Sequence, residues 1–147
     1  MGDESRANLR ELVEKELVIG NSDDVDRFEE VYAHDCTHHG LGCKGFDEIK
    51  QVHIMTKEAF PDLTFKIEDT IIEGDKVVTR KTAKGTHDGV YHGLSNVEFG
   101  IQPTGKTVEV DVIEIMRIEN GKIKEVWALL DHGSLLEQLG VEFTYGG

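Results

Sequence analysis

Residues 107–131 carry the pattern that most restricts the fold. The segments "TVEVDVIEIMRIE" and "KIKEVWALLD" are rich in β-branched residues and are joined by Asn120–Gly121. A tight hairpin turn needs positive φ at both central residues, which Asn and Gly accept most readily. We therefore predict a long β-hairpin. "LTFKIEDTII", "EGDK" and "VVTRKTAKGTH" predict a second hairpin around a glycine turn.

The first third of the chain has helical periodicity. One helix is predicted over residues 4–19 and ends at Gly20–Asn21, because apolar residues recur there on one face: Leu9, Leu12, Val13 and Leu17. A second helix is predicted from a Ser22 cap to about Tyr32. A third is predicted over residues 46–60, where Pro61 ends it.

These elements together predict an α+β fold in which the helices cover one face of a curved, mainly antiparallel sheet. A final short helix, "SLLEQLG", is expected to end at Gly140. We expect a single domain over residues 1–147, mainly helical over 1–60, mainly sheet over 61–131, and helical again over 132–140.

Composition narrows the range of partners. The formal net charge is −13, which repels nucleic-acid backbones. No apolar run of 18 or more residues could span a bilayer. The first twenty residues are acidic and lack an uninterrupted apolar core, unlike a secretion signal. We expect a cytoplasmic protein that binds neither nucleic acid nor membrane.

Four metal-binding residue types occur together in "DCTHHGLGC". Cys36 and Cys43 flank His38 and His39, and all four side chains are typical zinc ligands. The spacing contains no C-x2-C or H-x3-H pair, and adjacent histidines on an extended segment point to opposite sides. We therefore expect free thiols and no metal site.

Asp131 ends the apolar run "WALL" and allows two interpretations. Strand alternation would place Trp127, Leu129 and Asp131 on one face. If that face lined a hollow, the carboxylate would meet apolar groups and could serve as an acid or base. Alternatively, Asp131 could cap the helix that follows, as Ser134 also could.

Three further stretches carry a family resemblance. "RKTAKGTHDGVYHG" (80–93), "PTGKTVEV" (103–110) and "RIENGKIKEVWALLDHGSLLEQLG" (117–140) resemble the SnoaL-like polyketide cyclase family. That family lies within the nuclear transport factor 2-like and ketosteroid isomerase-like superfamily. The resemblance implies a cone of bent sheet around an apolar cavity. It also implies that Asp131, in the W-x-x-x-D match, is the acid/base residue of an aldol-type ring closure.

The resemblance suggests further site residues. His87, in "GTHDG", would donate a hydrogen bond to an enolate oxygen, unless it is simply tied into the sheet. His38 or His39 would lie near the cavity mouth. Arg80 would pair with a carboxylate such as Glu114 or bind substrate oxygen. The remaining candidates for the cavity wall are Trp127, Leu129, His53, Tyr91, Phe60, Phe99 and His92. The connection over residues 90–106 is longer than is usual in the family.

Three functions follow as hypotheses. The first is an acid/base enzyme, without cofactor or metal, that cyclises or isomerises a small apolar carbonyl compound through an enolate. The second is a non-catalytic protein that binds a small apolar ligand, and the third is a hydrolase resembling epoxide hydrolases on the same fold. We also expect a homodimer, or a higher homo-oligomer, through the outer sheet face, because "VEVDVIEIMRI" offers apolar residues to both faces.

Overall fold

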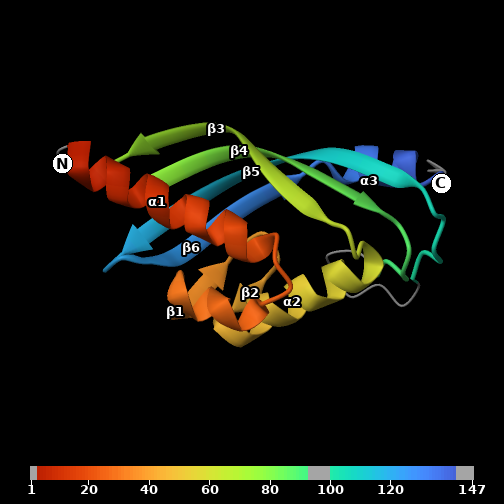
Figure 1. The fold of residues 1–147 in the computed structure, drawn as a ribbon, viewed down its shortest axis with the longest axis horizontal. Helices are drawn as coiled ribbons and strands as arrows, with labels where there is room; N and C mark the ends of the chain where they lie inside the picture. The colour runs from red at the N-terminus through yellow and green to blue at the C-terminus, as the bar shows by residue number, and fades with distance from the viewer. Residues whose placement is uncertain (1–2, 93–99, 142–147) are drawn as a thin grey trace, which may run out of the picture.

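The computed structural model describes residues 3–92 and 100–141. One strongly curved sheet of six strands, in the order β2-β1-β6-β5-β4-β3, forms the scaffold (Figure 1). Neighbouring strands are antiparallel except β1 and β6, which are parallel. The strands are β1 (Tyr32–His38), β2 (Cys43–Lys44), β3 (Thr64–Glu73), β4 (Lys76–Thr86), β5 (Thr107–Glu119) and β6 (Lys122–Leu130). The α+β prediction is confirmed.

Both predicted hairpins are present. β3 pairs with β4, and β5 pairs with β6 through the Asn120–Gly121 turn. Asn120 has φ 51° and Gly121 has φ 75°, as the turn requires.

Helices cover the concave side of the sheet. α1 (Asp3–Gly20) packs on β3 and β4, and α2 (Phe46–Ala59) lies below the sheet against β1 (Figure 1). Helix α3 (His132–Gln138) follows β6 and contacts β5. These three elements confirm the first, third and last predicted helices, and Gly140 ends the last with φ 84°. Within the described ranges, no helix combines the length and apolar character that crossing a membrane requires.

The segment between α1 and α2 differs from the prediction. In place of a helix to Tyr32, a short 3-10 helix, η1 (Val25–Glu30), precedes β1. Part of the predicted glycine-spaced loop forms β2. β1 takes its hydrogen bonds from β6, about 90 residues later in the chain. A partner so distant leaves no periodic signal in the segment itself, so residues 1–60 contain two strands that periodicity did not reveal.

A β-bulge in β6 decides which side chains face the helices. Ile118 pairs with Ile123 but Arg117 pairs with Glu125, so Lys124 is an extra residue in β6. The bulge reverses the alternation beyond it. Val126 is therefore buried on the concave side, whereas Trp127 pairs with Ile115 on the outer face.

Candidate active site

An apolar cavity lies between the concave face of the sheet and helices α1 and α2. Its volume is about 210 Å³. Valines from β5, Ala128 and Leu130 from β6, and aromatic rings from η1, α2 and its C-cap form much of its wall. An apolar wall of this kind lowers the local dielectric constant and strengthens electrostatic interactions beside it.

Four polar side chains form a cluster in the wall of this cavity. The Lys81 Nζ lies 2.9 Å from Oε1 of Glu114 and 3.4 Å from Oε2 of Glu16. The Tyr32 hydroxyl donates to Oε1 of Glu16 at 3.0 Å. Lys81 is 3% exposed and Glu16 9%. We call Glu16, Tyr32, Lys81 and Glu114 the carboxylate–lysine cluster.

The sequence places these groups by strand and helix periodicity. Lys81 shares the inward parity of Val77 and Ala83 on β4. Glu114 follows Val112 at the same inward parity on β5, so it is the diagonal cross-strand neighbour of Lys81. Glu16 lies one turn after Val13 on the buried face of α1.

Burial shifts the protonation equilibria within the cluster. Burial raises the pKa of Glu16; the charge of Lys81 opposes this and that of Glu114 adds to it, and the net shift is upward. Burial alone would lower the pKa of Lys81, but Glu16 and Glu114 outweigh it and hold the pKa above its ordinary value. Lys81 is therefore an ammonium at neutral pH. Burial also raises the pKa of Tyr32 well above its usual range, so Tyr32 is a neutral donor.

Hydrogen bonding leaves one carboxylate oxygen and one imidazole nitrogen available. Oε1 of Glu114 accepts from Lys81, whereas Oε2 has no hydrogen-bond partner in the described ranges. The His38 Nδ1 accepts from the Leu41 backbone N–H at 3.1 Å, so the neutral ring carries its proton on Nε2. Burial lowers the pKa of His38, with partial opposition from Glu114. A base and a neutral donor thus occupy one cavity wall.

Several predicted wall residues do line the cavity. His38, His53, Phe60 and Tyr91 all do so. Burial lowers the pKa of His53 to about 4, and its Nε2 has no partner among the described residues. Burial raises the pKa of Tyr91 to about 12, and its hydroxyl lies 3.1 Å from Nε2 of His132.

The predicted inward position of Asp131 is wrong. Asp131 is exposed, does not line the cavity, and is the N-cap of α3, where its Oδ1 accepts from the Ser134 backbone N–H at 3.1 Å. The alternative interpretation, helix capping, is the one that the structure confirms.

Trp127, Leu129 and His39 also lie outside the cavity, contrary to the prediction. Leu129 is 79% exposed on the outer face. The ring of His39 stacks on Trp127 at 4.7 Å, and its Nε2 lies 3.2 Å from Glu125. The physical reason is the bulge at Lys124, which adds one residue to β6 and so exchanges the faces of the residues that follow it.

His87 is fully buried beside the cavity and does not line it. Its Nδ1 accepts from the Thr104 backbone N–H at 3.2 Å, and its ring packs 5.4 Å from that of Phe60. Its Nε2 has no partner in the described part of the chain. The prediction that His87 faces the cavity is therefore wrong. The structure favours the alternative, in which a backbone hydrogen bond holds the His87 ring in place.

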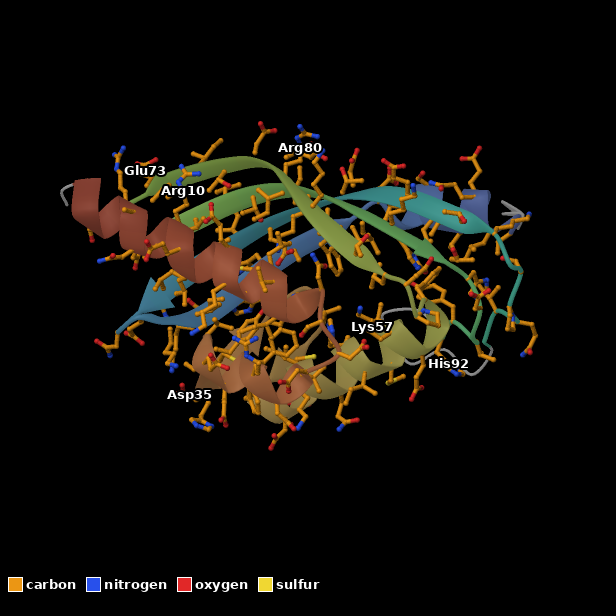
Figure 2. All side chains as sticks on the ribbon, viewed as in Figure 1. Arg10, Asp35, Lys57, Glu73, Arg80 and His92 are labelled. Carbon is orange, nitrogen blue, oxygen red and sulfur yellow. The ribbon has the colours of Figure 1, made fainter. Side chains whose placement is uncertain are left out.

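Arg80 lies outside the cavity as well. It extends from β4 away from α2 and pairs with Asp69 at 2.6 Å (Figure 2). Arg80 does form an ion pair, as one interpretation predicted. The expected partner was wrong, because Glu114 faces the other side of the sheet and binds Lys81. His92 is exposed, and Phe99 lies outside the described residues.

Sequence reasoning missed Glu16, Tyr32 and Lys81 and saw Glu114 only as a partner for Arg80. A signal was present for two of them. Lys81 and Glu114 are charged, whereas the other inward residues of these strictly alternating strands are uncharged. Charged residues at such positions are rare unless they are paired. Tyr32 had no comparable signal, because it lies on a strand that periodicity did not reveal.

The cysteines show no metal cluster. Cys36 and Cys43 are free and buried, and burial raises the pKa of the Cys36 thiol to about 11. Among the described residues, no group of three or more His, Cys, Asp or Glu side chains is placed to hold a metal ion.

Comparison with known proteins identifies the family. The family model for the SnoaL-like polyketide cyclases matches residues 10–139. The chain belongs to the SnoaL-like polyketide cyclase family. TsrD from Streptomyces laurentii, at 26% identity, superposes with a TM-score of 0.81, and the match covers 93% of this chain and 98% of TsrD. No curated protein matches the chain.

Other solved structures have a similar fold but are named for different activities. IdmH from Streptomyces antibioticus, named as a candidate polyketide cyclase, is 29% identical with a TM-score of 0.76 over 90% of this chain and 99% of its own. AclR from Streptomyces galilaeus, named as a candidate hydroxylase, is 26% identical with a TM-score of 0.77 over 91% and 82%. Because both names occur on one fold, the reaction of this SnoaL-like chain must be argued from its own cavity.

Proposed function

We propose that this protein is an acid/base enzyme that converts a small apolar carbonyl compound through an enolate, in a cyclisation or an isomerisation. The observation that supports this most strongly is the carboxylate–lysine cluster, which brings a carboxylate oxygen without a partner to the wall of an apolar cavity. The chain's own side chains supply a base, a fixed positive charge and neutral hydrogen-bond donors.

Glu114 takes the role that the sequence assigned to Asp131. Its Oε2 accepts a proton from the carbon next to the substrate carbonyl. The C–H electron pair moves into the new C=C bond, and the carbonyl oxygen becomes the enolate oxygen. The negative charge moves from Glu114 to the enolate, so the net charge of the cavity does not change. In a cyclisation, the enolate carbon attacks a second carbonyl, whose oxygen takes the proton from the Glu114 carboxyl group as the new C–C bond forms. In an isomerisation, the Glu114 carboxyl group returns its proton to another carbon of the conjugated enolate.

Two donors are available for the enolate oxygen. An ammonium has three N–H donors, and Lys81 uses two of them on Glu16 and Glu114. The His38 Nε2–H is the second donor, because Leu41 fixes the tautomer of the ring. Donors held in place by existing hydrogen bonds need little reorganisation as charge develops.

The test uses 2-tetralone, an apolar ketone whose α-protons exchange slowly with deuterated water. We expect the protein to accelerate this exchange, followed by proton NMR, and Glu114→Gln to reduce the acceleration by about 100-fold or more, as loss of a general base does. Glu73→Gln is the matched control, since Glu73 is exposed at the end of β3 and outside the cavity (Figure 2). Binding of 2-tetralone without accelerated exchange would instead favour a non-catalytic protein that binds a small apolar ligand.

We also propose that the protein forms a homodimer through the outer face of the sheet. Ile113 and Leu129 are directly paired on that face and are 50% and 79% exposed. Ile115 adds a neighbouring exposed apolar side chain. Exposed apolar side chains that lie together on a strand face are typical of a buried contact between chains.

A further inference from the structure

The charges that line the cavity do not balance. Glu16 and Glu114 are the two carboxylates in the wall, and Lys81 is the one ammonium among the lining residues. The other titratable groups there contribute no positive charge near neutral pH. Burial lowers the pKa of His38 below its ordinary value and that of His53 to about 4, and the two tyrosines are neutral.

The single cation is already fully paired. Lys81 lies between both carboxylates at 2.9 and 3.4 Å and is 3% exposed. With both carboxylates ionised, the cavity wall has a net charge of −1. With Glu16 protonated, Lys81 and Glu114 form a neutral pair. Neither state leaves a positive charge for an anionic ligand.

The net charge of the whole chain also disfavours an anionic ligand. Its formal net charge is −13, so the field outside the cavity also repels anions. An anionic group that entered the cavity would lose its hydration and find no unpaired cation in exchange, because Lys81 is already paired with both carboxylates. An uncharged group can instead accept from Lys81 or His38 and donate to Oε2 of Glu114.

We infer that the cavity selects ligands whose polar end is uncharged, such as a ketone, an enol, a hydroxyl or an amide, and excludes ligands that carry a carboxylate or another anion there. Glu114 is the residue that sets this selectivity, because its charge keeps the cavity wall neutral or negative in both protonation states of Glu16. The inference rests on the proposed function only in placing the ligand in this cavity. It adds the substrate class, an uncharged carbonyl compound rather than its free acid.

A matched pair of probes tests the selectivity. 2-Naphthamide and 2-naphthoate have the same apolar body and nearly the same shape, and only the second is charged. At pH 7.5, isothermal titration calorimetry should show at least tenfold tighter binding of the amide. 2-Naphthoate should bind about tenfold more tightly for each unit by which the pH falls from 8 to 6, because its binding requires uptake of one proton.

Variants assign the selectivity to one side chain. Glu114→Gln is close in shape to the wild type and should reduce the preference for the amide to about threefold or less. Glu73→Gln removes the same charge from the surface and should leave the preference unchanged. Circular dichroism checks that both variants fold, and the wild-type comparison stands without either of them.

Two outcomes would overturn the inference, and they are distinguishable. Equal or tighter binding of 2-naphthoate at pH 7.5, together with normal exchange of 2-tetralone, would refute the selectivity and leave the proposed function intact. If neither probe binds and 2-tetralone does not exchange, the cavity is not the ligand site and both proposals fail.

Discussion

Lys81 shows at the scale of a single residue why the cavity wall is polar. A buried ammonium is tolerated only when carboxylates surround it, and Glu16 and Glu114 do so. Such a network is weak evidence for stability, because apolar residues of similar volume often stabilise a core as well or better. We infer that the carboxylate–lysine cluster is present for its chemistry.

His53 predicts how stability depends on pH. Burial, with a smaller effect from Lys57, lowers its pKa in the folded state to about 4, against an ordinary value of 6.5. The unfolded chain therefore binds more protons between these values, so the free energy of unfolding falls as the pH is lowered from 6.5 to 4. We expect His53→Leu to weaken this dependence in urea titrations at pH 6.5, 5.5 and 4.5.

The control for His53 is His92→Asn, since His92 is exposed. It should keep the pH dependence of the wild type. A His53→Leu profile identical in slope to the wild type would contradict the assignment.

Residue types alone did not separate a cap from a base. Asp131 precedes a helix and ends an apolar strand, and both features are visible in the sequence, so both interpretations remained open. Only the position of a bulge decides between the two faces of β6, and a bulge has no reliable residue signature. Glu114, in contrast, could have been found from the alternation of β5 itself.

At the scale of elements, the sequence predicted those whose partners are close along the chain. The two hairpins and the three α-helices were predicted within a few residues, because turn chemistry and periodicity are local. β1 was missed because its hydrogen bonds go to β6, across most of the chain. The cavity depends on that strand, which supplies Tyr32 and His38.

The bulge in β6 can be tested by removing it. Deletion of Lys124 removes the extra residue, so Ile123, Glu125 and Val126 keep their partners on β5 and Val126 stays inward. We expect a loss of no more than about 1 kcal/mol in the free energy of unfolding, because the side chains of β6 keep their faces and the ion pair with Asp35 is what the deletion removes.

Lys124→Ala is the matched variant for this deletion, since it keeps the extra residue and removes only the exposed ion pair with Asp35. Its cost should be below about 1 kcal/mol in chemical denaturation. A loss of about 3 kcal/mol or more for the deletion variant would contradict the bulge, because in unbroken alternation the deletion would reverse the faces of β6 and expose buried side chains.

At the scale of the whole molecule, the sheet has two different faces. The concave face encloses the cavity, and the outer face presents Ile113, Ile115 and Leu129. The family resemblance predicted the cone, and the apolar residues on both faces of β5 predicted the exposed apolar strand. It could not assign the two faces of β6 correctly, so the predicted site was placed on the wrong side of that strand.

Replacement of Leu129 tests the proposed homodimer. We expect the wild type to sediment as a dimer at micromolar concentration and Leu129→Arg to sediment as a monomer, because a charge would be buried without a partner. Val18→Arg changes an exposed apolar residue on α1 and should remain dimeric. A monomeric wild type at that concentration would refute the dimer.

The most direct test compares two carboxylates in one assay. The rate of α-proton exchange of 2-tetralone is measured for the wild type, Glu114→Gln and Asp131→Asn under identical conditions. Our account predicts a loss of about 100-fold or more for Glu114→Gln and a change of less than about threefold for Asp131→Asn, which keeps a capping oxygen. The opposite order, with Asp131→Asn inactive and Glu114→Gln unimpaired, would contradict it.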